Sequence, residues 1–108
     1  MKALTFNRYA KRGNIALAEI VRPTPKADEI LVQVHAVGLN PVDLIIPTGA
    51  FKPFLKFNLP ATLGSDLAGV VVEVGSKVTR FKPGDAVFGS TFESGGGSLA
   101  EFAVVRES

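Results

Sequence analysis

Short runs of apolar residues with a two-residue period alternate with turn signals along most of this chain. The clearest run is VVVEV at 70–74, in which positions 70, 72 and 74 alternate with 71 and 73. This period is typical of a half-buried β-strand. We predict further strands wherever comparable β-rich runs occur, at 3–6, 15–21, 30–39, 86–88 and 99–105.

Prolines and glycines end these runs. Pro23 and Pro25 stop the second run, because proline has no N–H to donate to a strand ladder. In the segment 82–85, Pro83 presets φ and Gly84 can adopt a positive φ without steric cost. We therefore expect a turn there, and it would join the strands 70–74 and 86–88 as a hairpin.

The whole pattern predicts a mainly β fold of six or seven strands, in a barrel or a partly open barrel. Helix signals are sparse, so we expect only one or two short helical turns, one of them at 44–46 before Pro47. Residues 49–63 are expected to be irregular. Gly64 and Gly69 bracket a segment to which another stretch of backbone can come close.

Composition excludes several classes of function. The 108 residues suffice for one domain, and the 12 basic residues are scattered against 10 acidic ones, which argues against a nucleic-acid site. The chain has no cysteine, so disulfides, thiolate zinc ligands and cysteine nucleophiles are excluded. No apolar run approaches the roughly 18 residues of a membrane helix, and no signal peptide is apparent. These features predict a cytoplasmic protein without a membrane partner.

Three segments in order carry a family resemblance. They read VHAVGLNPVD at 34–43, then residues 60–89, then GSLAEF at 97–102. Together they resemble the N-terminal, GroES-like domain of the medium-chain dehydrogenase/reductase superfamily, in its zinc-independent NADPH:quinone oxidoreductase and enone reductase branch. The resemblance covers residues 1–108 as one GroES-like catalytic domain. It implies a partly open β-barrel, followed in the full protein by a Rossmann domain that this chain lacks.

Zinc-binding members of this superfamily carry a Gly-x-Cys-x-Ser/Thr-Asp element and a Gly-His-Glu element. By resemblance, Asn40 stands at the cysteine ligand position, Val42 at the hydroxyl used for proton relay, and Ser65 at the histidine ligand position. Catalytic zinc takes three ligands from thiolate, imidazole and carboxylate groups, and an amide and a hydroxyl are poor replacements. We therefore expect no metal.

Without zinc, the resemblance implies hydride transfer from NADPH to a quinone or an α,β-unsaturated carbonyl. It places Asn40, Pro41, Val42, Asp43 and Leu44 against the nicotinamide end of the cofactor. Asn40 and Asp43 are the candidate catalytic residues. The alternatives are that Asn40 is simply a turn residue before proline and that Asp43 caps the turn or orients neighbouring backbone.

The substrate pocket implied by the resemblance includes Phe51, Phe57 and Ser65. Phe51, Phe54 and Phe57 could form an apolar stacking wall, although core packing is an equal alternative. Many relatives have tyrosines at the positions of Leu44 and Phe51, so the substrate identity stays open. His35 lies within a predicted strand and is expected to be a partly exposed structural residue.

The chain has no Gly-x-Gly-x-x-Gly element that opens a helix, so the main cofactor-binding domain is expected beyond residue 108. We expect the 108-residue chain alone to be inactive and to bind NADPH weakly, and the full protein to be a homodimer. Two other functions remain open: a small GroES-like co-chaperonin and a non-catalytic interaction module. The choice between NADPH and NADH is also open.

Overall fold

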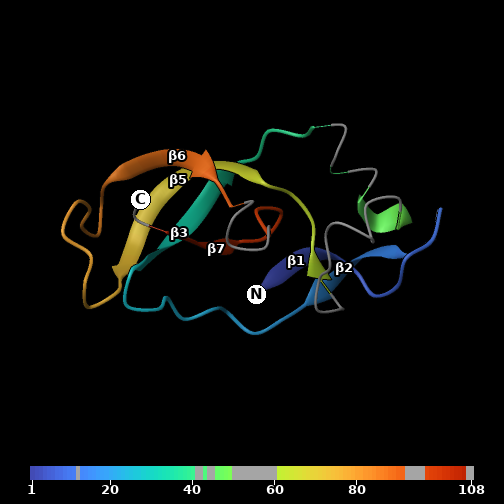
Figure 1. The fold of residues 1–108 in the computed structure, drawn as a ribbon, viewed down its shortest axis with the longest axis horizontal. Helices are drawn as coiled ribbons and strands as arrows, with labels where there is room; N and C mark the ends of the chain where they lie inside the picture. Colours follow the sequence, from blue (N-terminus) through green and yellow to red (C-terminus); the bar gives the residue numbers. More distant parts are fainter. Residues whose placement is uncertain (12, 41–42, 44–45, 50–60, 92–96, 107–108) are drawn as a thin grey trace.

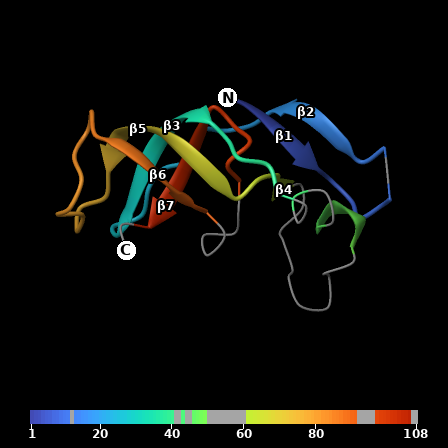
Figure 2. The same cartoon turned by 90° about the horizontal axis from the view of Figure 1, so that it is seen from above.

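The computed structural model describes residues 1–11, 13–40, 43, 46–49, 61–91 and 97–106. Within these residues the chain forms seven strands in two antiparallel sheets. The sheets lie next to each other along the long axis of the molecule (Figure 1), and the turned view separates them clearly (Figure 2).

The smaller sheet has the strand order β2-β1-β4. β1 pairs with β2 along its whole length, from Lys2 opposite Glu19 to Phe6 opposite Ile15, whereas β4 pairs with only two residues of β1. A short 3-10 helix, η1, packs at the connection between β1 and β2, where the buried Asn14 side chain donates to the Pro47 carbonyl at 2.9 Å. The bounds are β1 (Lys2–Phe6), β2 (Ile15–Glu19), β4 (Ala61–Thr62) and η1 (Ile46–Thr48).

The larger sheet has the order β6-β5-β3-β7, with bounds β3 (Glu29–Ala36), β5 (Asp66–Val74), β6 (Ala86–Ser90) and β7 (Phe102–Arg106). The central pair, β3 and β5, runs from Ile30 opposite Val74 to Ala36 opposite Ala68. β5 and β6 form the predicted antiparallel hairpin, and Gly84 in its turn has a φ of 97°. The prediction of this hairpin and of a positive φ at Gly84 is confirmed.

The mainly β prediction is also confirmed, and the arrangement is open. Among the described strands the two sheets do not join into a closed barrel. The helical turn predicted at 44–46 falls largely outside the described residues and stays a prediction, and the 3-10 helix η1 covers Ile46–Thr48. Two details of the prediction were wrong. The segment 49–63 is not irregular throughout, because Ala61–Thr62 forms β4. The second concerns the run 99–105.

Residues 99–105 do not form one strand, because their two ends pair with different sheets. The Leu4 N–H donates to the Leu99 carbonyl at 2.8 Å, and Ala100 forms a bridge with Ala3 in β1. From Phe102 onward the chain pairs with β3 as β7. The alternation of apolar residues continues through both parts, so periodicity alone could not locate the division. This segment links the smaller sheet to the larger one.

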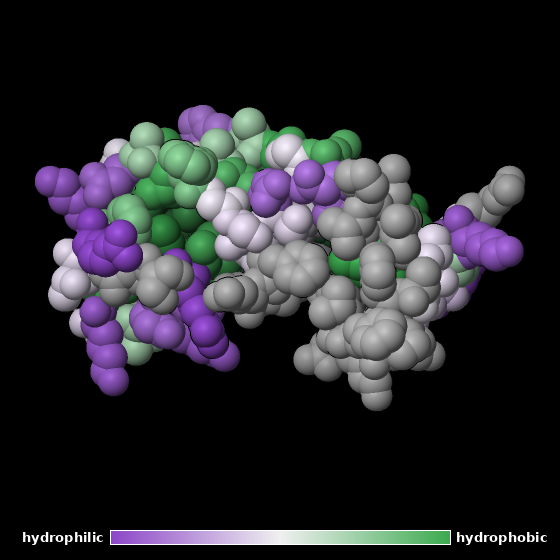
Figure 3. Space-filling model, turned by 45° about the horizontal axis from the view of Figure 1, so that its top comes forward, coloured by the Kyte–Doolittle hydropathy of each residue, from purple (hydrophilic) through white to green (hydrophobic). Residues whose placement is uncertain are grey.

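Each sheet has its own apolar core. In the larger sheet, Val32 of β3 and Val71 of β5 are buried on one face, together with Ile30, Leu67 and Ala103. This face remains open in a hollow of about 210 Å³, and Figure 3 shows hydrophobic side chains gathered in it. In the smaller sheet Phe6 is 1% exposed and packs with a second group of residues, Ile46, Ala61 and Leu63.

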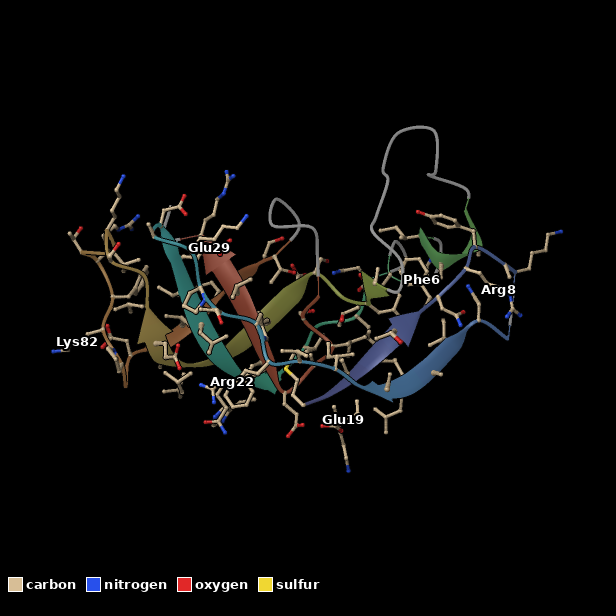
Figure 4. The ribbon with its side chains drawn as sticks, turned by 90° about the horizontal axis from the view of Figure 1, so that it is seen from below. Phe6, Arg8, Glu19, Arg22, Glu29 and Lys82 are labelled. Atoms are coloured by element: carbon tan, nitrogen blue, oxygen red, sulfur yellow. The ribbon has the colours of Figure 1, made fainter. Side chains whose placement is uncertain are left out.

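The segment between β2 and β3 covers the other face of the larger sheet. The Arg22 guanidinium carbon lies 4.1 Å from the centroid of the Phe102 ring, and Arg22 Nη2 lies 3.3 Å from Glu73 Oε1. Leu31 is opposite Glu73 in the strand pairing and is fully buried. Paired residues point to the same face of a sheet, so Arg22 lies over the face that holds Leu31. Figure 4 shows Arg22 beside β3 and β7.

The close approach predicted at Gly69 is present. A Cβ atom there would overlap the Gln33 carbonyl oxygen of β3 and crowd the Val32 side chain. Gly89, on the neighbouring strand β6, has open space around the equivalent position. Neither glycine has a positive φ, so the two sites differ in space and not in backbone strain.

We therefore expect Gly69→Ala to lower the free energy of unfolding by about 2–4 kcal/mol, because β3 must move away from β5. Gly89→Ala is the matched control, and it should leave the free energy of unfolding unchanged or raise it by about 0.5 kcal/mol. Urea denaturation followed by circular dichroism measures both. Equal effects of the two substitutions would show that backbone approach at Gly69 does not limit the packing of the sheet.

Candidate functional site

The candidate site lies where the loop after β3 meets the beginning of β5. The antiparallel register places Ala36, the last residue of β3, opposite Ala68, near the first residues of β5. Asn40 then reaches Asp66, and its side-chain Nδ2 donates to Asp66 Oδ2 at 2.7 Å. The sheet register therefore brings together the two elements that the sequence carries 26 residues apart.

Asn40 and Asp43 form a tight reciprocal turn. The Asn40 N–H donates to Asp43 Oδ2 at 2.9 Å, and the Asp43 N–H donates to the Asn40 carbonyl at 2.9 Å. Asp43 is only 3% exposed. Asp43 therefore orients the backbone of its own turn, and its catalytic role stays a prediction.

Ser65 and Thr91 join this turn to the larger sheet. Ser65 Oγ lies 3.5 Å from Asp43 Oδ1, at the limit of a hydrogen bond. Thr91 follows β6 and donates from both its backbone N–H and its Oγ1 to the Ser65 carbonyl, the latter at 3.1 Å. Both Ser65 and Thr91 are buried. We call the group of Asn40, Asp43, Ser65, Asp66 and Thr91 the polar cluster.

The polar cluster has a buried part and an accessible part. Asp43, Ser65 and Thr91 are buried, whereas Asn40 and Asp66 are partly exposed. Leu39, next to Asn40, is 67% exposed. A ligand that approaches this region would therefore meet the side chains of Leu39, Asn40 and Asp66 first.

Ser65, predicted in the substrate pocket, lies in the buried part of the polar cluster. His35, expected to be a partly exposed structural residue, is exposed on β3. The remaining predicted site residues lie outside the described residues: Pro41, Val42, Leu44, Phe51, Phe54 and Phe57. Their predicted roles stay predictions.

Sequence reasoning gave no role to Asp66 or Thr91. Asp66 is the last residue of the Gly64-Ser65-Asp66 element, but the spacing in the sequence does not indicate that its partner is Asn40. Thr91 carries no sequence signal, because its contact depends on the β5–β6 register, which places Asp66 opposite Ser90 and brings the next residue to Ser65.

The side chains of the polar cluster are a poor set of zinc ligands. Asn40 and Ser65, at the positions that the resemblance assigns to two metal ligands, both donate toward aspartates. In the described part of the chain no three histidine or acidic side chains gather into a group that could hold a metal ion. Zinc prefers thiolate, imidazole and carboxylate ligands, so an amide and a hydroxyl do not fit it.

The turn at Asn40 has counterparts elsewhere in the fold. The Lys82 N–H donates to Asp85 Oδ2 at 3.0 Å, and the Asp85 N–H donates back to the Lys82 carbonyl at 3.1 Å. Lys26 and Glu29 repeat the arrangement at 2.9 and 3.0 Å. In each case an acidic residue lies three positions after the residue whose N–H it accepts, as in a capping box. This spacing is a sequence signal that could have predicted the turn.

Comparison with known proteins shows the family of this chain. Residues 26–108 match the family model of the alcohol dehydrogenase GroES-like domain. The chain belongs to this family. The resemblance of the GroES-like domain to quinone oxidoreductases of the medium-chain dehydrogenase/reductase superfamily is confirmed by its relatives.

A chloroplast envelope quinone oxidoreductase homolog of Arabidopsis thaliana is 46% identical over 110 residues, which cover 99% of this chain and 33% of the relative. A solved quinone oxidoreductase from Coxiella burnetii matches with a TM-score of 0.85 and 31% identity, over 98% of this chain and 34% of that one. The Escherichia coli quinone oxidoreductase complexed with NADPH matches with a TM-score of 0.79 and 25% identity, over 98% of this chain and 31% of that one.

The chain therefore spans about one third of the length of these relatives. None of the helices in the described ranges is long and apolar enough to cross a membrane.

The two matched turns allow a test of the polar cluster. Asp43→Ala removes the acceptor for the Asn40 N–H in a buried position, so we expect the free energy of unfolding to fall by about 1–3 kcal/mol. Asp85→Ala removes the same contact from a more exposed turn, where the loss should be about 1 kcal/mol or less. Urea denaturation of both variants measures the difference. A loss at Asp85 equal to or larger than that at Asp43 would contradict the importance of the buried turn.

Proposed function

We propose that this chain is the catalytic domain of a metal-free NAD(P)H-dependent oxidoreductase that reduces quinones or related α,β-unsaturated carbonyl compounds. Relatives that match nearly the whole chain are named quinone oxidoreductases, and one solved relative is described as a complex with NADPH. These names support the substrate class and the cofactor.

The observation that carries the proposal is the hydrogen bond from Asn40 to Asp66. At the position where the resemblance expects a zinc ligand, the chain presents an amide that is oriented by a carboxylate and partly exposed. Such a site can form hydrogen bonds with a polar ligand group but supplies no metal Lewis acid. This chemistry suits a reaction in which the protein positions the reactants and a cofactor provides the electrons.

The accessible residues fit one end of a nicotinamide cofactor. A nicotinamide is a flat ring that carries a primary carboxamide; the exposed Leu39 offers apolar surface, and the Asn40 amide offers hydrogen-bonding groups. When bound, the cofactor supplies a hydride to the acceptor. The chain's own contribution is to hold Asn40 in place: Asp43 fixes its backbone, and Asp66 contacts its side chain.

The proposal also includes a second domain, which is argued from the length of the chain relative to that of its relatives. The chain spans about one third of its relatives, so we propose that a Rossmann domain which binds most of the cofactor belongs to the full protein. The proposed homodimer and the choice between NADPH and NADH depend on that domain as well.

A chimera tests this function. We expect replacement of the matching third of the Arabidopsis relative by residues 1–108 to give a protein that oxidises NADPH when 1,4-benzoquinone is added. The chain alone, shown to be folded by circular dichroism, should give no turnover, because the cofactor has too few contacts. Absorbance of NADPH measures both.

Two controls sharpen the result. Prior treatment with a zinc chelator should leave the rate of the chimera unchanged, and a simple 2-alkenal tested beside the quinone separates the two substrate classes. Turnover by the isolated chain or inhibition by the chelator would contradict the proposal. An inactive but folded chimera would favour the alternative of a non-catalytic interaction module, and a ring of subunits on a sizing column would favour a co-chaperonin.

A further inference from the structure

Asn40 is held at two independent points. Its backbone N–H donates to Asp43, a member of the same turn, and its side-chain Nδ2 donates to Asp66, the first residue of β5. The reciprocal bonds between Asn40 and Asp43 close the turn by themselves, as the equivalent bonds do between Lys82 and Asp85. The contact with Asp66 is therefore not needed to form the turn, and it acts on the side chain alone.

This contact fixes the polarity of the Asn40 amide. The oxygen and the NH₂ group of an asparagine are similar in size, so rotation by half a turn about χ2 has little steric cost. An ionised carboxylate only accepts hydrogen bonds, so Asp66 selects the orientation in which Nδ2 faces it. The bond is charge-assisted and short, at 2.7 Å. Within the described residues, no other hydrogen bond uses Oδ1 or the second N–H of Nδ2.

The position of the pair suits a ligand better than it suits the core. Asn40 and Asp66 are partly exposed, whereas Asp43 and Ser65 are buried behind them. Contacts between partly exposed polar groups contribute little to stability because water competes for them. The same exposure lets a ligand reach the groups of Asn40 that Asp66 does not use.

We propose that Asp66 is a positioning residue, which presets the Asn40 amide so that its Oδ1 accepts from, and its second N–H donates to, a ligand group such as a primary carboxamide. The identity of the ligand rests on the proposed function; the orientation of the amide does not. Presetting a side chain in its bound orientation improves affinity, because binding no longer has to select one rotamer.

A reciprocal exchange separates this role from a purely structural one. The double variant Asn40→Asp with Asp66→Asn keeps one amide and one carboxylate in contact, but it moves the amide to the other side of the pair. If the pair only stabilises the fold, the exchange should restore both stability and ligand binding. If Asp66 positions the amide, the exchange should keep the urea midpoint of the wild type but raise the KM for NADPH by about tenfold in the chimera, a loss equal to about 1.4 kcal/mol.

Single variants complete the series in the chimera. Asp66→Ala removes the acceptor, so we expect the KM for NADPH to rise by about tenfold, with a smaller change in kcat. Asp66→Asn keeps an acceptor oxygen but also permits the reverse orientation, so its effect should be intermediate. Asp85→Ala is the matched control in a distant turn, and it should leave both kinetic constants unchanged.

Nuclear magnetic resonance of the 108-residue chain gives a readout that is independent of activity. The two side-chain NH₂ signals of Asn40 should be shifted from those of the exposed Asn7, and Asp66→Ala should move them toward the Asn7 positions. Signals that do not respond to Asp66→Ala would overturn the proposal, as would an exchange variant with a normal KM. If the wild-type chimera is inactive but the Asn40 signals respond to Asp66→Ala, the proposed function is overturned. The proposal that Asp66 orients the Asn40 amide is then still supported.

Discussion

The antiparallel pairing of β3 with β5 is the contact on which the rest of the structure depends. These strands form the centre of the larger sheet, with β7 on one side and β6 on the other. They can pair along their length because Gly69 leaves room for the Gln33 carbonyl. Their register also places the loop that holds Asn40 beside the first residue of β5. One close backbone contact therefore supports both the core and the candidate site.

The polar cluster joins its side chains by hydrogen bonds at the two positions that the resemblance assigns to zinc ligands. Both positions that the resemblance assigns to zinc ligands carry donors here, and each donor faces its own aspartate: Asn40 faces Asp66 and Ser65 faces Asp43. A metal ion would attract all four oxygen and nitrogen groups to one centre. Hydrogen bonds instead join them in pairs, which holds the turn against β5 and leaves the outer pair accessible.

The local parts of this fold could be predicted from the sequence, and the long-range parts could not. The turn at Pro83 and Gly84 and the alternation in β5 were readable because each signal lies within a few residues. β4 was missed because two residues are too few to show a period. The division of residues 99–105 was missed because it depends on β1, almost 100 residues away. The resemblance indicated Asn40 and Asp43. Their neighbours Asp66 and Thr91 could not be predicted, because long-range strand pairing brings them to this place.

The division of the segment after Gly97 also affects the order in which the chain can fold on the ribosome. β1 and β2 are separated by a short connection, so they can pair as soon as both have emerged. The bonds from β1 to Leu99 and Ala100, and the bond from the Glu101 N–H to the Lys2 carbonyl, cannot form until residues 99–101 have been synthesised. β4 can pair with Thr5 and Phe6 on this edge of β1 as soon as residues 61–62 have been made. The part of the same edge from Lys2 to the Leu4 N–H stays open until residues 99–101 have followed.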